Sequence, residues 1–369
     1  MTRFGQRGFT LIELMIALLI SSLLVGMILA IFSRMSLAYR GQQQIAGVQQ
    51  VLAAARATIE LDAKQAGLGV SGGFRSVVTG ANLRSPVIIT DSAAAPDQLA
   101  LFYADTSTQG VVTGGALPGA LTLDNTVGFV AGSLVVLTNV STAVSPAGSN
   151  DPYLATYQAC VLKIAAGGVA AGSLTFENIA PWGPSTGAGC VITNGITMAY
   201  PFIAHAYRID TTTPARAALG ALQQSVTGGL LGGAEVWTDL AYGFSDLQTA
   251  LRVQDPAGTD VDGDTDATHN WYSGGNQVTA AQIPPTPANS TLAGISISLV
   301  AHTDRTIEGI TTATTPSLTG APVNNNSLGN RPSTVLPTTP PWPDPLLPGD
   351  RIYRYTTFQV DFRNLGVGL

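Results

Sequence analysis

The sequence predicts an α+β protein in which one long N-terminal α-helix, membrane-spanning in its first half and amphipathic in its second, packs on a large antiparallel β-rich globular head. Three observations carry this prediction. An apolar run fills residues 9–32, and apolar residues then recur at helical spacing as far as residue 59. The rest of the chain is poor in charge and rich in glycine, proline, serine and threonine.

The apolar run is long enough to cross a membrane. Its 24 residues would form a helix of about 36 Å, and the hydrocarbon core of a bilayer is about 30 Å thick. Arg3 and Arg7 lie in the short leader, residues 1–8, directly before it. By the positive-inside rule, the N-terminus is expected in the cytoplasm and the remaining chain on the other side, with membrane lipid around residues 9–32.

Glu13 is the one charged residue in this run. A carboxylate inside a membrane span costs about 2.5–3.5 kcal/mol on insertion scales, although the positive end of the helix dipole lowers that cost in the first turn. Glu13 is expected to lack a partner within its own helix. A simple anchor whose glutamate reaches the interface is one alternative. A cleaved secretory signal fits less well, because the run is too long and continues into a helical pattern.

The segment GFTLIELMIAL, Gly8–Leu18, resembles the processing motif of type IV prepilins. The shared features are a basic leader, Gly8 before the scissile bond, Phe9 after it and a glutamate five residues into the mature chain. The resemblance implies that a prepilin peptidase cleaves between Gly8 and Phe9 and that the new Phe9 amine is N-methylated. It also implies that Glu13 pairs with the N-terminal amine of a neighbouring subunit during assembly.

The helical pattern continues beyond the apolar run. One face is apolar and the opposite face is polar, as in an amphipathic helix. The apolar face carries Ile45, Val48, Leu52, Ala55 and Ile59, and the polar face carries Gln42, Gln43, Gln50, Arg56 and Glu60. Because no proline occurs before residue 86, one helix over residues 9–66, about 85 Å long, is predicted. The glycines that begin at Gly67 are expected to end it.

Residues 67–369 form the predicted head, in which turn residues separate short runs of β-forming residues. Strands are predicted at Gln98–Tyr103, Ser133–Thr138, Cys160–Ala165, Leu174–Asn178, Phe202–Arg208, Val236–Ala241, Ile295–Ala301 and Tyr353–Phe362. The last two alternate between apolar and polar residues, which predicts a sheet with one face packed on the helix. Residues 311–349 contain nine prolines and predict an extended surface loop.

Composition argues against several classes of function. Charged residues make up 11 % of the chain, against about 25 % in typical soluble domains. Net charge is −6 and Lys64 and Lys163 are the only lysines, so direct nucleic-acid binding is not expected. The three histidines, His205, His269 and His302, are far apart in sequence. Because no set of nucleophile, base and orienting residue is evident, the chain is not expected to be an enzyme.

Cys160 and Cys190 are the only cysteines. An even pair in an exported chain favours a disulfide, with two buried free thiols as the alternative. On the chain-entropy model, a bond that closes a loop of this length would contribute about 3–4 kcal/mol.

An aspartate-rich turn lies in the second half of the head. It contains Asp260, Asp262, Asp264 and Asp266 around Gly263. Closely spaced carboxylates suit Ca²⁺, although the glutamate and flanking helices of an EF-hand are missing. Calcium is therefore a candidate ligand while no cofactor is required, and the alternative is a solvated acidic turn.

The head also resembles PilW-type minor pilins in YRID at 207–210, VWTDLAYG at 236–243 and the closing strand at 356–364. The resemblance implies a minor pilin that helps to prime pilus assembly near the fibre tip, in support of twitching motility, adhesion or DNA uptake. Its implied partners are the major pilin, other minor pilins and an inner-membrane assembly platform.

The implied location is the inner membrane of a Gram-negative bacterium, with a periplasmic head, and then the fibre at the cell surface. Two other functions remain open. One is a type II secretion pseudopilin, and the other is a membrane-tethered, calcium-dependent adhesin.

Overall fold

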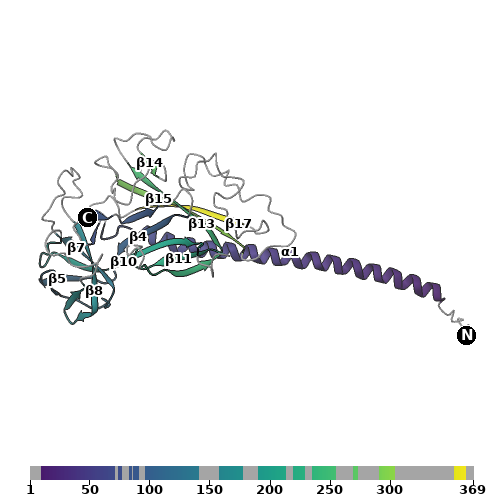
Figure 1. Cartoon of the computed structure of the whole chain (residues 1–369), viewed down its shortest axis with the longest axis horizontal. Coiled ribbons are helices and arrows are strands. Elements are labelled where there is room, and N and C mark those ends of the chain that lie inside the picture. Colours follow the sequence, from purple (N-terminus) through teal and green to yellow (C-terminus); the bar gives the residue numbers. More distant parts are fainter. Residues whose placement is uncertain are drawn as a thin grey trace, which may run out of the picture.

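The computed structural model describes residues 10–70, 74–76, 83–84, 86–90, 96–140, 158–177, 190–212, 219–228, 235–254, 269–272, 291–303 and 353–362. Its single described helix, α1 (Leu11–Gln65), has 55 residues and is about 80 Å long. The N-terminal part of α1 projects from a β-rich head, and its C-terminal part lies within that head (Figure 1). The predicted α+β layout is thus confirmed.

The two halves of α1 have different surroundings. The side chains of residues 10–40 are exposed, and this part of the helix is long and apolar enough to cross a membrane. Burial begins at Gly41 and then follows the predicted apolar face through Val48, Leu52, Ala55 and Ile59. Ile45, at the lower end of that face, is half-buried. The first half thus presents an uncovered apolar surface, whereas the head covers one face of the second.

The larger sheet of the head has twelve strands. They are β1 (Phe74–Ser76), β2 (Leu83–Arg84), β3 (Val87–Thr90), β4 (Gln98–Ala104), β5 (Gly110–Gly115), β6 (Leu121–Leu123), β7 (Leu134–Val140), β8 (Gln158–Ala170), β9 (Ser173–Phe176), β10 (Met198–Asp210), β11 (Ala221–Ser225) and β12 (Thr238–Tyr242). The long strand β10 is central, because it pairs with β4, β5, β7 and β11 along different parts of its length. Among the described pairings only β1 with β8 is parallel.

The smaller sheet has four antiparallel strands in the order β14-β13-β15-β17. Their bounds are Phe244–Gln254 for β13, His269–Tyr272 for β14, Thr291–His302 for β15 and Tyr353–Asp361 for β17. All eight strands predicted from sequence are present, with shifted ends. The sequence prediction missed the other strands, which are β13 and β14 in this sheet and β1, β2, β3, β5, β6 and β11 in the larger one. Of these, β13 is central to the smaller sheet.

The buried face of α1 lies against both sheets in one apolar cluster. Val48, Leu52 and Ile59 share this cluster with β4 and β10 of the larger sheet and with β13, β15 and β17 of the smaller one. A second cluster covers the other face of β4 and β10, around Phe102 and Phe202. Ile59 is fully buried, and burial of such a side chain contributes about 1.5–3 kcal/mol. The helix is therefore part of the core of the head.

Candidate functional site

Thr10 and Glu13 form a capping box at the start of α1. The Thr10 amide and hydroxyl each donate to Glu13 Oε2 at 3.0 Å, and the Glu13 amide donates to Thr10 Oγ1 at 3.3 Å. The expectation that Glu13 lacks a partner within its own helix was therefore wrong. The reason is that the first backbone amides of a helix have no partner of their own, so a nearby carboxylate can accept from them.

Glu13 lies in the first turn of α1, in an exposed apolar setting. Leu11 beside it is 78 % exposed, and the large apolar residues of the helix remain exposed through Phe32. The Glu13 carboxylate is itself exposed. The predicted cleavage site, Gly8 and Phe9, lies outside the described residues. The geometry thus shows an accessible carboxylate that is held by Thr10.

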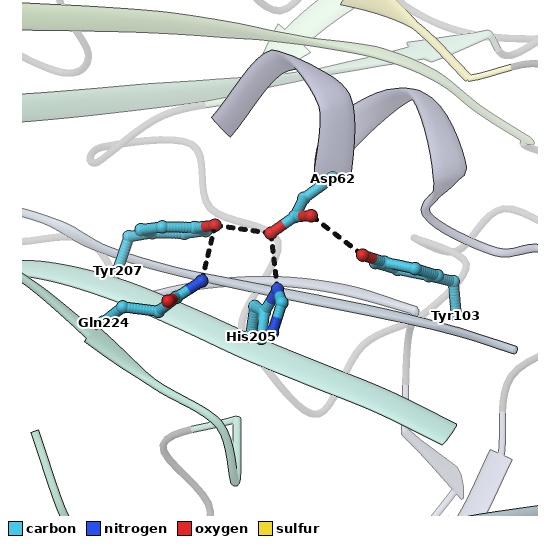
Figure 2. A network of polar contacts seen from close by, with 5 residues as sticks. All are labelled: Asp62, Tyr103, His205, Tyr207 and Gln224. Atoms are coloured by element: carbon cyan, nitrogen blue, oxygen red, sulfur yellow. Dashed lines mark hydrogen bonds and ion pairs between the residues drawn. The ribbon is translucent and has the colours of Figure 1, made fainter. Parts of the chain in front are cut away.

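A second carboxylate lies near the other end of the same helix. Asp62 is on the buried face of α1, is 5 % exposed, and accepts hydrogen bonds from three side chains of the larger sheet. Tyr103 of β4 donates to Oδ1 at 2.8 Å, while Oδ2 contacts Nδ1 of His205 at 2.6 Å and the hydroxyl of Tyr207. Gln224 of β11 donates to the Tyr207 oxygen at 2.9 Å. Figure 2 shows Tyr103, His205 and Tyr207 converging on Asp62 from one side of the helix, with Gln224 bonded to the Tyr207 oxygen.

Burial and hydrogen bonding act in opposite directions on Asp62. Burial favours the neutral acid, but the hydrogen bonds from His205, Tyr207 and Tyr103 and the charge interaction with His205 together outweigh it, so the pKa of Asp62 lies below its usual value. Burial and the adjacent carboxylate both raise the pKa of Tyr103 and of Tyr207. Asp62 is therefore ionised, and both phenols keep their protons to donate to it. We refer to Asp62, Tyr103, His205, Tyr207 and Gln224 as the Asp62 network.

The sequence prediction missed Asp62 as a functional residue. A signal was present, because Asp62 continues the apolar face three residues after Ile59 and is the one acidic residue buried on it. The sequence could not supply its partners, since they lie 41 to 145 residues away along the chain. His205, treated as an isolated histidine in the sequence, belongs to this network.

The predicted disulfide between Cys160 and Cys190 is present. Cys160 is buried in β8, within the apolar cluster formed by β5 to β9. The bond ties the segment around Cys190 to this part of the larger sheet. The alternative of two free thiols is thereby excluded in this structure.

The candidate calcium ligands Asp260, Asp262, Asp264 and Asp266 lie outside the described residues, as does the loop 311–349. Within the described part of the chain, no three side chains of histidine, cysteine, aspartate or glutamate come together as a metal site. For His269 only the backbone, in β14, is described. His302 is buried, and its Nδ1 lies 2.9 Å from the Thr303 carbonyl oxygen.

Two of the three sequence blocks on which the expected resemblance to minor pilins rests meet on the larger sheet. The guanidinium of Arg208, in YRID, lies 4.2 Å from the ring centre of Trp237, in VWTDLAYG. Arg208 also donates to Gln223, which in turn donates to Asp239. These contacts join β10, β11 and β12 on the face opposite the Asp62 network. The polar residues of the two blocks therefore support the pairing of these strands.

The N-terminal region matches a known family model. Residues 3–29 match the model of the prokaryotic N-terminal methylation motif. Comparisons with curated proteins and with solved structures found no match. α1 is consistent with a single-pass membrane anchor, and the motif suggests a structural protein that a prepilin peptidase processes. The chain carries a prepilin-type N-terminal methylation motif that extends into the apolar first half of a long helix, which supports a type IV pilin-like or pseudopilin-like protein.

Proposed function

We propose that this chain is a minor pilin of a type IV pilus that helps to start assembly at or near the fibre tip. The observation that carries the proposal is the exposed apolar half of α1, which has Glu13 in its first turn and the methylation motif over residues 3–29. A helix with this surface needs lipid before assembly and other helices after it. The head, in contrast, has its own apolar core.

In the proposed sequence of events, a prepilin peptidase cleaves between Gly8 and Phe9 and the new amine is methylated. Thr10 then becomes the second residue of the mature chain, and it still holds Glu13 within the helix. When the subunit enters a fibre, the Glu13 carboxylate exchanges Thr10 for the amine of a neighbouring pilin subunit. Because the capping contacts are local and exposed, this exchange requires no change in the head.

The size of the head favours a minor over a major subunit. About 300 residues follow α1, and so large a head is difficult to repeat along a thin fibre but easy to place at low copy near a tip. The partners in this proposal are the major pilin, other minor pilins and the inner-membrane assembly platform. The head would lie in the periplasm before assembly and at the cell surface afterwards.

The test is to shear surface filaments from the native cells and to identify this chain, with its N-terminal peptide, by mass spectrometry. A low-abundance peptide that begins at N-methylated Phe9 in the filament fraction is the expected result. A processed chain confined to the envelope, together with loss of exoprotein secretion on deletion, would instead identify a type II secretion pseudopilin, which shares the same N-terminal features. An uncleaved Met1 or Thr2 start would contradict both and return the chain to a tethered adhesin.

A further inference from the structure

α1 contacts the two sheets of the head in different ways. At the end of the helix, the Asp62 network ties α1 to β4 and β10 by directional hydrogen bonds. Lower on the helix, Val48 to Ile59 meet the smaller sheet through apolar side chains, and the guanidinium of Arg56 lies 5.2 Å from the ring centre of Phe358. Apolar packing thus runs along the buried face of α1 from Val48 to the C-cap residue Ala66, whereas the directional polar contacts are concentrated at Asp62.

The chain just beyond α1 strengthens the same attachment. The Gly67 amide donates to the Phe102 carbonyl at 3.0 Å, and the Ala104 amide donates to the Leu68 carbonyl at 2.8 Å. Gly69 has φ of +73°, and a Cβ there would lie 2.7 Å from Cβ of Ala104, so this turn passes close against β4. Backbone and side-chain bonds from the helix end therefore reach the same strand.

The strands that receive these bonds are themselves well supported. β4 and β10 pair over six residues, from Phe202 opposite Ala104 to Tyr207 opposite Leu99. Gln224 links Tyr207 to β11, which continues the sheet. A displacement of Asp62 along the helix axis would break three hydrogen bonds together, and hydrogen bonds weaken steeply with distance and angle. Apolar contact is non-directional and resists such sliding less.

From these contacts we infer that the Asp62 network is a mechanical clamp: under tension on α1, its hydrogen bonds to β4 and β10 resist sliding of the helix more than the apolar packing does. The inference rests on the proposed function for its purpose, because a subunit anchored in a fibre by its helix is pulled through that helix. The physical claim concerns a single molecule. The experiment below can therefore contradict the clamp while the proposed pilin function stands. It can also support the clamp in a chain that never enters a fibre.

The experiment is single-molecule force spectroscopy on the full-length chain in detergent, with handles attached at Ser36 on the exposed part of α1 and at Val130 on the distal side of the head. Forced detachment reports the rate of breaking rather than the equilibrium stability. Asp62→Asn should raise the rate at which α1 detaches at constant force about tenfold, since it weakens bonds to a charged acceptor. Tyr207→Phe should raise it about threefold, and this variant keeps the test open if Asp62→Asn fails to fold.

Two matched controls separate a clamp from general destabilisation. Arg56→Ala removes the contact with Phe358 on the smaller sheet, and it should change the detachment rate less than about twofold. Leu174→Ala weakens the distal apolar cluster, and it should lower the melting temperature without changing the detachment rate. The inference is overturned if neither Asp62→Asn nor Tyr207→Phe speeds detachment. It is equally overturned if Leu174→Ala speeds detachment as much as they do.

Discussion

The two ends of α1 each place a carboxylate in an apolar setting, and they satisfy it in opposite ways. Glu13 is exposed and accepts hydrogen bonds from Thr10, three residues away. Asp62 is buried and accepts from side chains 41 to 145 residues away. A carboxylate held by local, exposed contacts can exchange its partner at low cost, whereas one held by distant strands cannot move without opening the head. One end of the helix is thus suited to assembly and the other to attachment.

The largest effect on stability is expected from Asp62→Ala. The substitution leaves the buried donors Tyr103, His205 and Tyr207 without their acceptor, and removing one member of a buried charged network typically costs about 3–5 kcal/mol. Guanidinium unfolding of the full-length chain, followed by tryptophan fluorescence, measures the change. A loss below about 1 kcal/mol would show that the network is not a principal attachment.

Acid should weaken the same end of the helix. Because the folded-state pKa of Asp62 lies below the ordinary value of 3.8, its contribution to stability is fully present above that value and is lost as the pH falls through the folded-state pKa. We take the difference in melting temperature between the wild type and Asp62→Asn at pH 5 as the reference. It should then shrink below pH 4. A difference that stayed constant down to pH 2.5 would contradict the role of the ionised carboxylate.

Local pattern was sufficient for much of the fold. The long helix and eight strands follow from the spacing of apolar residues, because each of these elements buries one continuous face. β13 is among the strands that were missed, because it does not present one continuous apolar face. Its alternate residues Asp246 and Gln248 are polar yet only 3 % and 1 % exposed, so the strand does not show the apolar pattern of a buried element.

The same contrast applies to the two carboxylates. Glu13 could be identified from sequence because the motif around it is contiguous, from Gly8 to Leu18. The position of Asp62 on the apolar face was visible, but its meaning depends on which residues of β4 and β10 face the helix. That register is set by the packing of the whole head. Sequence spacing alone therefore could not bring Tyr103, His205 and Tyr207 to one point.

A smaller effect is expected from Tyr103→Phe. It removes the 2.8 Å bond to Oδ1 of Asp62 and leaves the two contacts to Oδ2, so the free energy of unfolding should fall by about 1 kcal/mol. Tyr200→Phe on β10 is a matched control, because the contacts of its hydroxyl within the described part of the chain are long, 3.5 Å to Gln109 and 3.4 Å to the Met198 sulfur. Equal losses for the two variants would mean that the phenol of Tyr103 contributes by packing alone.

Glu13→Ala should have the smallest effect on stability, and it tests most directly whether the two ends of α1 act independently. The capping box that it removes is exposed and lies outside the head, so the melting temperature of the head should not change measurably. Membrane insertion should persist as well, because the substitution leaves the apolar surface of the span intact. Incorporation into sheared fibres, measured by quantitative mass spectrometry against Thr10→Ser as a control that keeps the cap, should fall severalfold or more.

Equal amounts of Glu13→Ala and wild type in fibres would contradict an exchange of partners at Glu13. A lowered melting temperature of the head would contradict the independence of the two ends of α1. If Glu13 serves assembly and Asp62 serves attachment to the head, a substitution of Glu13 must leave the stability of the head unchanged.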